Sequence, residues 1–398
     1  MGKSSKDKRD AYYRLAKEQG WRARSAFKLL QLDEEFDLFK DVTRVVDLCA
    51  APGSWSQVLS RVLIKGEKFG RSAWQDKEAQ FRQQMLRVFS PEKTAAVDVQ
   101  ELSVQGKDGA PKPREDVKIV AIDLQPISPL SGITTLRADI THPATVPLLL
   151  KTLDPEYDPS SMTQQASHPV DLVLSDGAPD VTGLHDLDIY VQSQLLFAAL
   201  NLALCVLKPG GKFVAKIFRG RNVDVLYAQL KLFFERVVVA KPRSSRASSI
   251  EAFIVCLNFQ PPPGFIASLD EPLGVGQKLP DMIKERTSQL PIIAKATMQS
   301  PVTGAWDWTP DSGAQPRADG VVEVEIEDEV EAHRSDVGWI APFIACGDLS
   351  AFDSDASYQL PEDHVTLDPV QPPTAPPYKR ALEMRRAAGG AYGKTVRS

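Results

Sequence analysis

Carboxylates stand at the ends of strand-like apolar runs in the first half of the chain. These acids are Asp47, Asp123, Asp139 and Asp176. The carboxyl ends of parallel strands meet at one edge of a sheet, and ligands of such sheets bind there. A carboxylate can accept hydrogen bonds from both hydroxyls of a ribose, as we expect of Asp123, or from an adenine amino group, as we expect of Asp139. Each acid alone could equally be a helix cap or a loop residue, but together they predict a ligand site.

The loop after the first of these runs suits a ligand that is not a dinucleotide. In "VVDLCAAPGSWSQVL", we expect Gly53 to allow a close backbone approach, Ser54 to cap a helix and Trp55 to form an aromatic wall. The loop lacks the G-x-G-x-x-G pattern that holds a pyrophosphate. A cationic ligand with a ribose fits the acids better. S-adenosylmethionine has a sulfonium, a ribose and an adenine, and it fits the set.

A lysine stands inside an apolar alternation in the middle of the chain. In "KFVAKIF", which follows a Pro-Gly-Gly turn, Lys216 lies between Ala215 and Ile217. Lysine is rarely buried without a partner, because burial of its charge is costly. A lone lysine in such a run is more often an edge residue whose amine reaches water. Lys216 alone therefore does not indicate a catalytic role, and further residues must support one.

The elements that would position these residues alternate along the chain. Strand-like runs occupy 44–50, 118–124, 133–140, 170–176, 212–218, 236–241 and 251–257, with helical patterns at 54–65, 188–207 and 223–235. Strands that alternate with helices predict an α/β fold with a mostly parallel, seven-stranded sheet and helices on both faces. The last two runs are too close for a crossover helix, so we expect the last strand to be antiparallel.

Charge and composition divide the chain into parts. We expect a basic, helical N-terminal segment at 1–43, a central domain at 44–260 with an inserted helix and loop at 66–117, and a Pro-rich, partly acidic and partly disordered extension at 261–398. The formal net charge is -5. Residues 1–28 nevertheless hold nine Lys and Arg against three acids, a distribution compatible with a nucleic-acid partner.

Several classes of protein are disfavoured by the sequence. The N-terminus has no apolar region typical of a secretory signal, and no run approaches the length of a membrane span. The four cysteines are scattered, which indicates reduced thiols in an intracellular protein. No Cys and His cluster has the spacing of a metal site, so we expect no metal.

Five separated motifs resemble the FtsJ-type RNA ribose 2'-O-methyltransferases, and more closely their eukaryotic tRNA anticodon-loop branch. The motifs are "WRARSAFKLLQLD", "VVDLCAAPGSWSQVL", "VLSDGAPDVTGLHDLD", "VLKPGGKFVAKIFRGR" and "AKPRSSRASSIEAFIVC". The resemblance implies a Rossmann-like class I fold that uses S-adenosylmethionine. It also implies a Lys-Asp-Lys-Glu tetrad at Lys28, Asp176, Lys216 and Glu251.

The resemblance gives Lys216 the role of general base toward a ribose 2'-hydroxyl. A lysine can accept a proton only when it is neutral, and burial and a nearby cation both lower its pKa. We expect Lys28 to be that cation, with Asp176 and Glu251 orienting the pair. Methyl transfer from a sulfonium needs no metal, so positioning and proton transfer are the contributions expected of the protein.

Basic and aromatic residues near the N-terminus suit contacts with RNA phosphates and unpaired bases. The residues that we expect to contact RNA are Lys6, Lys8, Arg9, Arg22, Arg24, Arg219, Arg221, Arg243 and Arg246. An ordinary solvated surface is the alternative interpretation of the N-terminal group. The resemblance implies tRNA as substrate, methylated at nucleotides 32 and 34 in the cytoplasm. It also implies a helical-repeat protein and a WD-repeat protein as partners that select the nucleotide.

Other functions stay open on the sequence alone. Within the same chemistry, the substrate could be ribosomal RNA or an mRNA cap. A non-catalytic RNA adaptor that binds S-adenosylmethionine is an alternative of another class, although an adaptor would not need all four tetrad residues. A small-molecule O-methyltransferase is disfavoured by the basic N-terminus and by the lack of an evident metal-binding set.

Overall fold

The computed structural model describes residues 10–70, 113–158, 169–179, 184–220, 223–270, 272–273, 315–316, 322–323, 341–348, 352–358, 360, 365, 367–370 and 384. Four predicted RNA contacts lie outside these residues, namely Lys6, Lys8, Arg9 and Arg221, as do most of the predicted insert and most of the acidic run. The chain forms two units, residues 1–274 with 342–398, and residues 275–341. In the second unit, β8 (Gln315–Pro316) pairs antiparallel with β9 (Val322–Glu323).

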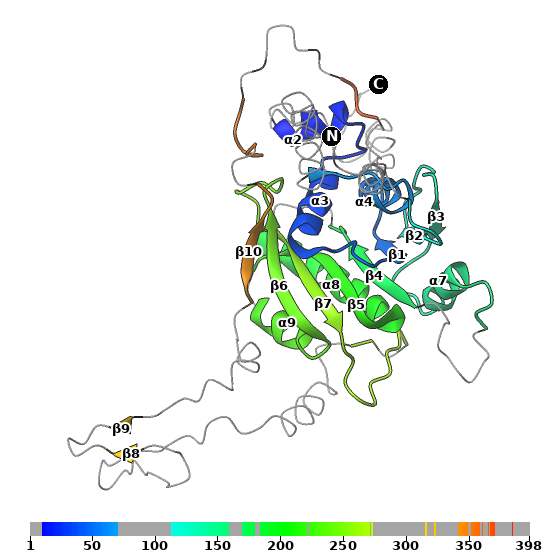
Figure 1. Cartoon of the computed structure of the whole chain (residues 1–398), viewed down its shortest axis with the longest axis vertical. Coiled ribbons are helices and arrows are strands. Elements are labelled where there is room, and N and C mark those ends of the chain that lie inside the picture. Colours follow the sequence, from blue (N-terminus) through cyan, green and yellow to red (C-terminus); the bar gives the residue numbers. More distant parts are fainter. Residues whose placement is uncertain are drawn as a thin grey trace, which may run out of the picture. The chain divides into compact units, whose positions relative to one another are not determined.

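An eight-stranded sheet forms the centre of the first unit (Figure 1), with the strand order β10-β6-β7-β5-β4-β1-β2-β3. β7 is antiparallel to both of its neighbours, and the other pairs are parallel. The predicted α/β, Rossmann-like fold with an antiparallel last strand is confirmed. The strands are β1 (Arg44–Leu48), β2 (Lys118–Asp123), β3 (Ile133–Arg137), β4 (Val170–Ser175), β5 (Leu207–Phe218), β6 (Phe234–Pro242), β7 (Glu251–Phe259) and β10 (Phe343–Cys346).

The predicted number of seven strands is wrong, because the tail adds an eighth. β10 pairs in parallel with the edge strand β6, in the register Phe343 with Val239 and Cys346 with Pro242. Cys346 is fully buried in the main core cluster. A run of four residues in a Pro-rich tail is too short to show the periodicity of a strand. The predicted domain boundary after residue 260 therefore placed this strand in the C-terminal extension.

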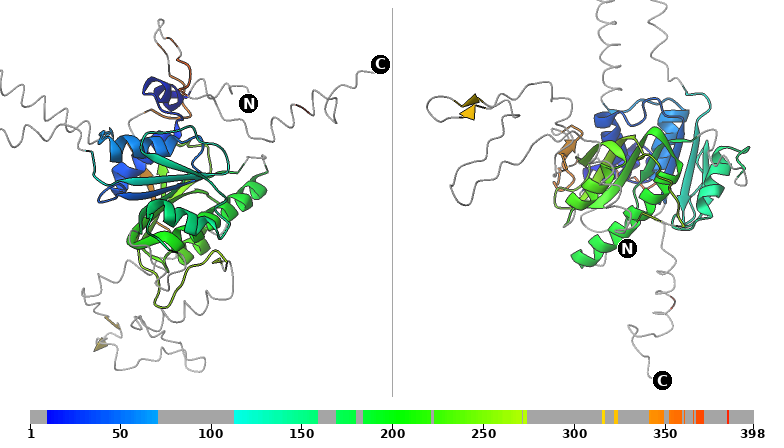
Figure 2. Two further views of the ribbon diagram at one scale, coloured as in Figure 1. Left: turned by 90° about the vertical axis from the view of Figure 1, so that its right-hand side faces the viewer. Right: turned by 90° about the horizontal axis from the view of Figure 1, so that it is seen from below.

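Helices cover both faces of the sheet (Figure 2). One face carries α3 (Ser25–Phe36), α4 (Ser54–Leu59) and a π-helical turn at Ser60–Ile64, preceded in the chain by α2 (Ala11–Glu18). The other face carries α7 (Thr145–Leu153), α8 (His185–Val206) and α9 (Val223–Leu230). The predicted helix at 223–235 ends early because β6 begins at Phe234.

Alternation along the central strands decides which side chains reach α3 and α4. Val45, Val214 and Phe253 belong to the core cluster that these helices complete. Since side chains two residues apart in a strand share a face, Lys216 and Glu251 also point to this side. The fold thereby places two charged side chains at the end of an apolar face.

The long helix α8 differs from one expectation. By length and apolar composition, its part from Asp186 to Val206 could cross a membrane, whereas the sequence predicted no such run. Half of that span is buried in the domain, and α8 packs against β4 and β5. Core helices often satisfy this criterion, so it is weak evidence for a membrane span.

Candidate active site

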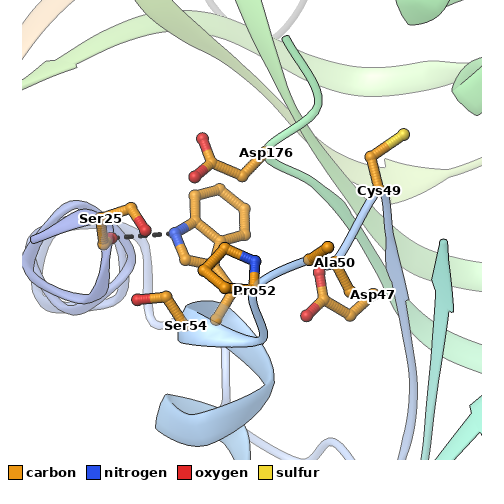
Figure 3. Close-up of a pocket in the computed structure, with 9 residues that line it drawn as sticks. Ser25, Asp47, Cys49, Ala50, Pro52, Ser54 and Asp176 are labelled. Atoms are coloured by element: carbon orange, nitrogen blue, oxygen red, sulfur yellow. Dashed lines mark hydrogen bonds between the residues drawn. The ribbon is translucent and has the colours of Figure 1, made fainter. Parts of the chain in front are cut away.

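A cavity opens at the carboxyl ends of β1 and β4, where the order of the strands reverses. It has about 220 Å³ of space, counting its open mouth. Figure 3 shows Asp47 and Asp176 around it, with Ser25 at the start of α3 and Ser54 at the start of α4. Its lining residues are Ser25, Asp47, Cys49, Ala50, Ala51, Pro52, Ser54, Trp55 and Asp176. This is the edge at which the sequence predicts a ligand.

Asp47 is a buried carboxylate with one oxygen available to a ligand. Its side chain is fully buried, and Oδ2 accepts a hydrogen bond of 2.5 Å from Ser56 Oγ. Among the described residues, Oδ1 has no hydrogen-bond partner. Burial, together with the charges of Asp176 and Asp123, raises the pKa of Asp47 to about 7, although the hydrogen bond from Ser56 acts to lower it. A ligand that brings a donor or a positive charge would relieve this buried oxygen.

The two other predicted cofactor acids have different surroundings. Asp123 is half-buried at the end of β2, where its oxygens accept from the backbone N–H groups of Ala51 (2.9 Å) and Gln125 (2.7 Å). It thereby fixes the cavity loop, and its remaining lone pairs can accept from a ribose. Asp139 is exposed beyond the end of β3 and accepts from the N–H and hydroxyl of Thr141. The structure does not bring Asp139 into the cavity lining.

Gly53 and Ser54 act differently from the sequence expectation. Gly53 is itself the N-cap of α4 at φ 94°, so the predicted N-cap role of Ser54 is wrong. A Cβ on Gly53 would come 2.5 Å from a guanidinium nitrogen of Arg22, so the close approach is made by the protein's own side chain. Ser54 Oγ donates to the carbonyl of Ala23 (3.1 Å). The loop is thus fastened to the turn before α3.

Trp55 provides the expected aromatic wall. Its side chain is 1% exposed, and its indole N–H donates to the carbonyl of Ser25 (2.9 Å). The ring also packs on Phe253 of β7, with the ring centroids 5.6 Å apart. Trp55 therefore holds α3, the cavity loop and the sheet together.

The four predicted tetrad residues come together beside this cavity. Lys216 pairs with Phe253, and Phe218 pairs with Glu251, so Lys216 and Glu251 are diagonal neighbours on one face. Asp176 follows β4, the parallel neighbour of β5. Lys28 lies in the second turn of α3, which covers this face. Four separate elements thus supply the four side chains.

Short contacts join the tetrad. Lys216 Nζ lies 2.6 Å from Asp176 Oδ1 and 3.8 Å from Glu251 Oε2. It also donates to the backbone carbonyl of Asp176 at 2.9 Å. Lys28 Nζ lies 2.6 Å from Glu251 Oε1. Both lysines are buried, at 8% and 7% exposure for Lys28 and Lys216, so each charge is satisfied within the cluster.

The proton affinities of the two lysines are the reverse of the expected order. Burial lowers the pKa of Lys28, and the charge of Lys216 adds to this, so its pKa lies below the usual range. Burial also acts to lower the pKa of Lys216, but Asp176 and Glu251 outweigh it and the pKa is raised. Burial acts to raise the pKa of Glu251, yet Lys28 and Lys216 bring it down to about 2. The two carboxylates therefore favour the protonated form of Lys216.

Two positioning residues were missed by the sequence analysis. Gln192 of α8 is buried, and its amide nitrogen donates to the carbonyls of Gly177 (3.0 Å) and Lys216 (2.9 Å). Ser245 Oγ donates to Glu251 Oε1 at 2.6 Å. A glutamine within an apolar helical run could have indicated Gln192, whereas Ser245 lies among other serines in "PRSSRASS".

Four of the predicted RNA contacts make contacts within the protein. Arg22 donates to the carbonyls of Pro52, Ser128 and Pro129, each at 3.0 Å. Arg24 and Arg246 both pair with the buried carboxylate of Asp10, the N-cap of α2, and Arg243 pairs with Asp353. Arg219 is exposed, with its guanidinium 5.5 Å from the ring centroid of Phe343. The RNA contacts of all five stay a prediction.

Within the described residues, no group of three His, Cys, Asp or Glu side chains has the arrangement of a metal site. The acids of the site are instead engaged by lysines, hydroxyls and backbone amides. Such groups can accept hydrogen bonds from a cationic ligand and can take part in proton transfer.

Known proteins match most of the chain. It is 47% identical over 389 residues to the tRNA (cytidine(32)/guanosine(34)-2'-O)-methyltransferase of Schizosaccharomyces pombe, covering 97% of this chain and 99% of that protein. It is 42% identical over 401 residues to the Homo sapiens protein of the same name, covering 100% and 88%. A pre-rRNA 2'-O-ribose RNA methyltransferase of Gallus gallus is 34% identical over 265 residues, covering 66% and 24%. Residues 21–259 match the FtsJ-like methyltransferase family, and the chain belongs to that family.

Proposed function

We propose that the protein transfers a methyl group from S-adenosylmethionine to a ribose 2'-hydroxyl in the anticodon loop of tRNA, at nucleotides 32 and 34. The observation that carries the proposal is the enclosed tetrad of Lys28, Asp176, Lys216 and Glu251 beside a cavity. Asp176 belongs to both, since it lines the cavity and contacts Lys216. A methyl donor and a proton acceptor could therefore meet at this residue.

The residues of the cavity fit S-adenosylmethionine. Asp47 Oδ1 is a buried acceptor without a partner among the described residues, and Asp123 keeps lone pairs that could accept from ribose hydroxyls. Trp55 offers an apolar wall, and the carboxylates suit a ligand that carries positive charge. When bound, this cofactor would supply an activated methyl group on a cationic sulfur.

Lys216 would take the proton of the attacking hydroxyl. Asp176 and Glu251 raise the pKa of its amine and so favour the protonated form. To act as a base it must first lose that proton, and a positive charge near Asp176 lowers the pKa of the neighbouring amine. Lys28, while charged, shares Glu251 with Lys216, since its Nζ lies 2.6 Å from Glu251 Oε1. Both effects favour neutral Lys216 once a cationic ligand is present.

The relatives support tRNA over the alternatives. The relatives named for tRNA align with nearly the whole chain, including its tail, whereas the relative named for pre-rRNA aligns with 66% of it and only 24% of itself. A non-catalytic adaptor would not require the four charges to be enclosed together. We also propose a cytoplasmic location and, as selectors of the nucleotide, a helical-repeat protein and a WD-repeat protein.

The test is methyl transfer from labelled S-adenosylmethionine to unmodified tRNA and, separately, to ribosomal RNA, with and without cell extract. The extract supplies any partner protein. We expect label on the riboses of nucleotides 32 and 34 of tRNA after nuclease mapping. Label found only on ribosomal RNA would show that ribosomal RNA, and not tRNA, is the substrate. Cofactor binding without methylation of either RNA would favour the non-catalytic adaptor.

A further inference from the structure

We propose that the C-terminal strap, defined as residues 342–348 and 352–358, is a positioning element of the active site, with Ser354 and Asp355 as its positioning residues. It would act through the loop at 243–250, which lies between β6 and β7 and leads into Glu251. The catalytic part of this inference rests on the proposed function.

The first part of the strap is fixed to the sheet and to α3. β10 extends the sheet beside β6, with further bonds from Val239 N–H to the Pro342 carbonyl (2.8 Å) and from Arg243 N–H to the Cys346 carbonyl (2.9 Å). Gly347 follows at φ 88°, and a Cβ there would come 2.7 Å from Gln31 of α3. The strap thus leaves the sheet at the point where the loop begins.

The second part of the strap contacts the loop through side chains. Ser354 is buried, and its hydroxyl donates to the carbonyl of Ser244 at 2.8 Å. Asp355 accepts from the backbone N–H of Ser248 (2.9 Å) and from its hydroxyl (3.1 Å). These hydrogen bonds lower the pKa of Asp355, so it is charged at neutral pH. A charged acceptor makes the stronger kind of hydrogen bond.

Helix α3 holds the same loop from its other side. Gln31 Oε1 accepts from both the N–H (2.9 Å) and the hydroxyl (2.8 Å) of Ser244. Arg24, at the start of α3, donates to the Ser244 carbonyl and to Ser354 Oγ. Ser244 is therefore clamped between α3, which carries Lys28, and the strap.

The clamped loop reaches the Glu251 carboxylate through the hydroxyl of Ser245, while Ser249 Oγ accepts from the Glu251 N–H at 3.1 Å. Ser245, next to the clamped residue, donates to Glu251 Oε1, the oxygen that also lies 2.6 Å from Lys28. A shift of the loop would move this donor away from Glu251 and change how Glu251 is shared between the two lysines. The strap thereby influences the geometry of the proton-accepting group from about a hundred residues further along the chain.

A purely protective role would account for part of the strap but not for all of it. Covering the edge of β6 against unwanted pairing requires β10 alone. The contacts of Ser354 and Asp355 lie beyond β10 and are directed at the loop. A third role is autoinhibition, in which the acids of the strap would occupy positions meant for RNA phosphates. The three roles predict different results.

The experiment uses the full chain with Asp355→Ala, Ser245→Ala and the double variant, and with Asp368→Ala as a control at an exposed acid of the tail. We expect each single variant to lower kcat on tRNA about tenfold, while the Kd for S-adenosylhomocysteine stays within about twofold. The double variant should lose about as much as either single variant, because the two residues act in series. Additive losses, or a kcat of Asp355→Ala equal to that of the control, would overturn the proposal. A higher kcat or tighter tRNA binding in Asp355→Ala would show that the strap is autoinhibitory and not a positioning element.

Amide hydrogen exchange tests the strap without any substrate. In Asp355→Ala and in Ser354→Ala, the backbone N–H groups of 244–251 should exchange faster, while those of β1 and α4 keep their wild-type rates. Exchange in the loop that matches wild type would contradict the proposal even if the wild-type enzyme methylates no tRNA. Asp355→Asn keeps an acceptor for the Ser248 N–H and should restore most of the protection, which a general loss of folding would not allow.

Discussion

Replacement of Glu251 by glutamine removes the carboxylate that lies between two buried lysines. Its pKa falls from the usual 4.5 to about 2 in the folded protein. A difference of that size corresponds to ~3 kcal/mol of folding free energy at neutral pH. Since the folded-state pKa is depressed, this stabilisation is complete above pH 4.5 and is lost as the pH falls toward 2. Glu251→Gln should therefore lower the free energy of unfolding by ~3 kcal/mol at pH 7.

The assay is urea unfolding of both proteins between pH 7 and pH 3, with Glu156→Gln as an exposed control. We expect the difference between wild type and Glu251→Gln to shrink as the pH falls below 4.5, because wild type loses its ion pairs there. Loss of the carboxylate also lowers the pKa of Lys216, so methyl transfer by the variant should reach its plateau at a lower pH. Equal stability of the two proteins at pH 7 would refute the view that Glu251 is the charged centre of the tetrad.

Three further variants separate positioning, cofactor binding and RNA binding. Gln192→Met removes the donor to the carbonyls of Gly177 and Lys216 and should lower kcat about tenfold or more. Gln229→Met, the control at another buried glutamine, should leave kcat unchanged in the same assay. Because the pKa of Asp47 is raised, the wild-type protein should lose stability as the pH rises from about 4 to about 7. Asp47→Asn should flatten that part of the curve of unfolding free energy against pH. It should also weaken cofactor binding measured by calorimetry. Arg22→Met should weaken binding of S-adenosylhomocysteine about tenfold by loosening the cavity loop. Arg219→Met should weaken binding of tRNA and leave binding of S-adenosylhomocysteine unchanged in parallel titrations.

Much of the site could be predicted because it follows from strand geometry. The alternation around Lys216 placed it in a strand, and the fold places it on the face covered by α3. Asp47 and Asp176 end neighbouring parallel strands, so their proximity follows from the sheet alone. Asp139 does not follow from this argument because β3 ends at Arg137 and the acid accepts from Thr141, so its contact with a ligand stays a prediction.

Long-range contacts between side chains could not be predicted from the sequence. A basic residue near a motif looks the same whether it meets a phosphate or a carbonyl of its own chain, and Arg22 and Arg24 meet their own chain. The pKa of Lys216 depends on whether burial or two carboxylates have the larger effect. That balance is decided by distances of 2.6 and 3.8 Å, which only the folded structure gives.

The strap shows the same limit over a longer separation. "FIAC" is short and lies in a Pro-rich tail, so it has no periodicity from which to predict a strand. Its place beside β6 depends on the edge that the rest of the sheet leaves open. Ser354 and Asp355 then find partners about a hundred residues earlier, in a loop whose sequence gives no sign of them.

The most direct test of the proposed function is a single-turnover measurement of methyl transfer to tRNA by wild type and by Lys216→Met. Lys151→Met serves as a control at an exposed lysine, and cell extract is added to each reaction. We predict that Lys216→Met binds S-adenosylmethionine but transfers methyl groups to nucleotides 32 and 34 at least about a hundredfold more slowly, while the control matches wild type. Methylation of the same riboses by Lys216→Met at the wild-type rate would contradict the account.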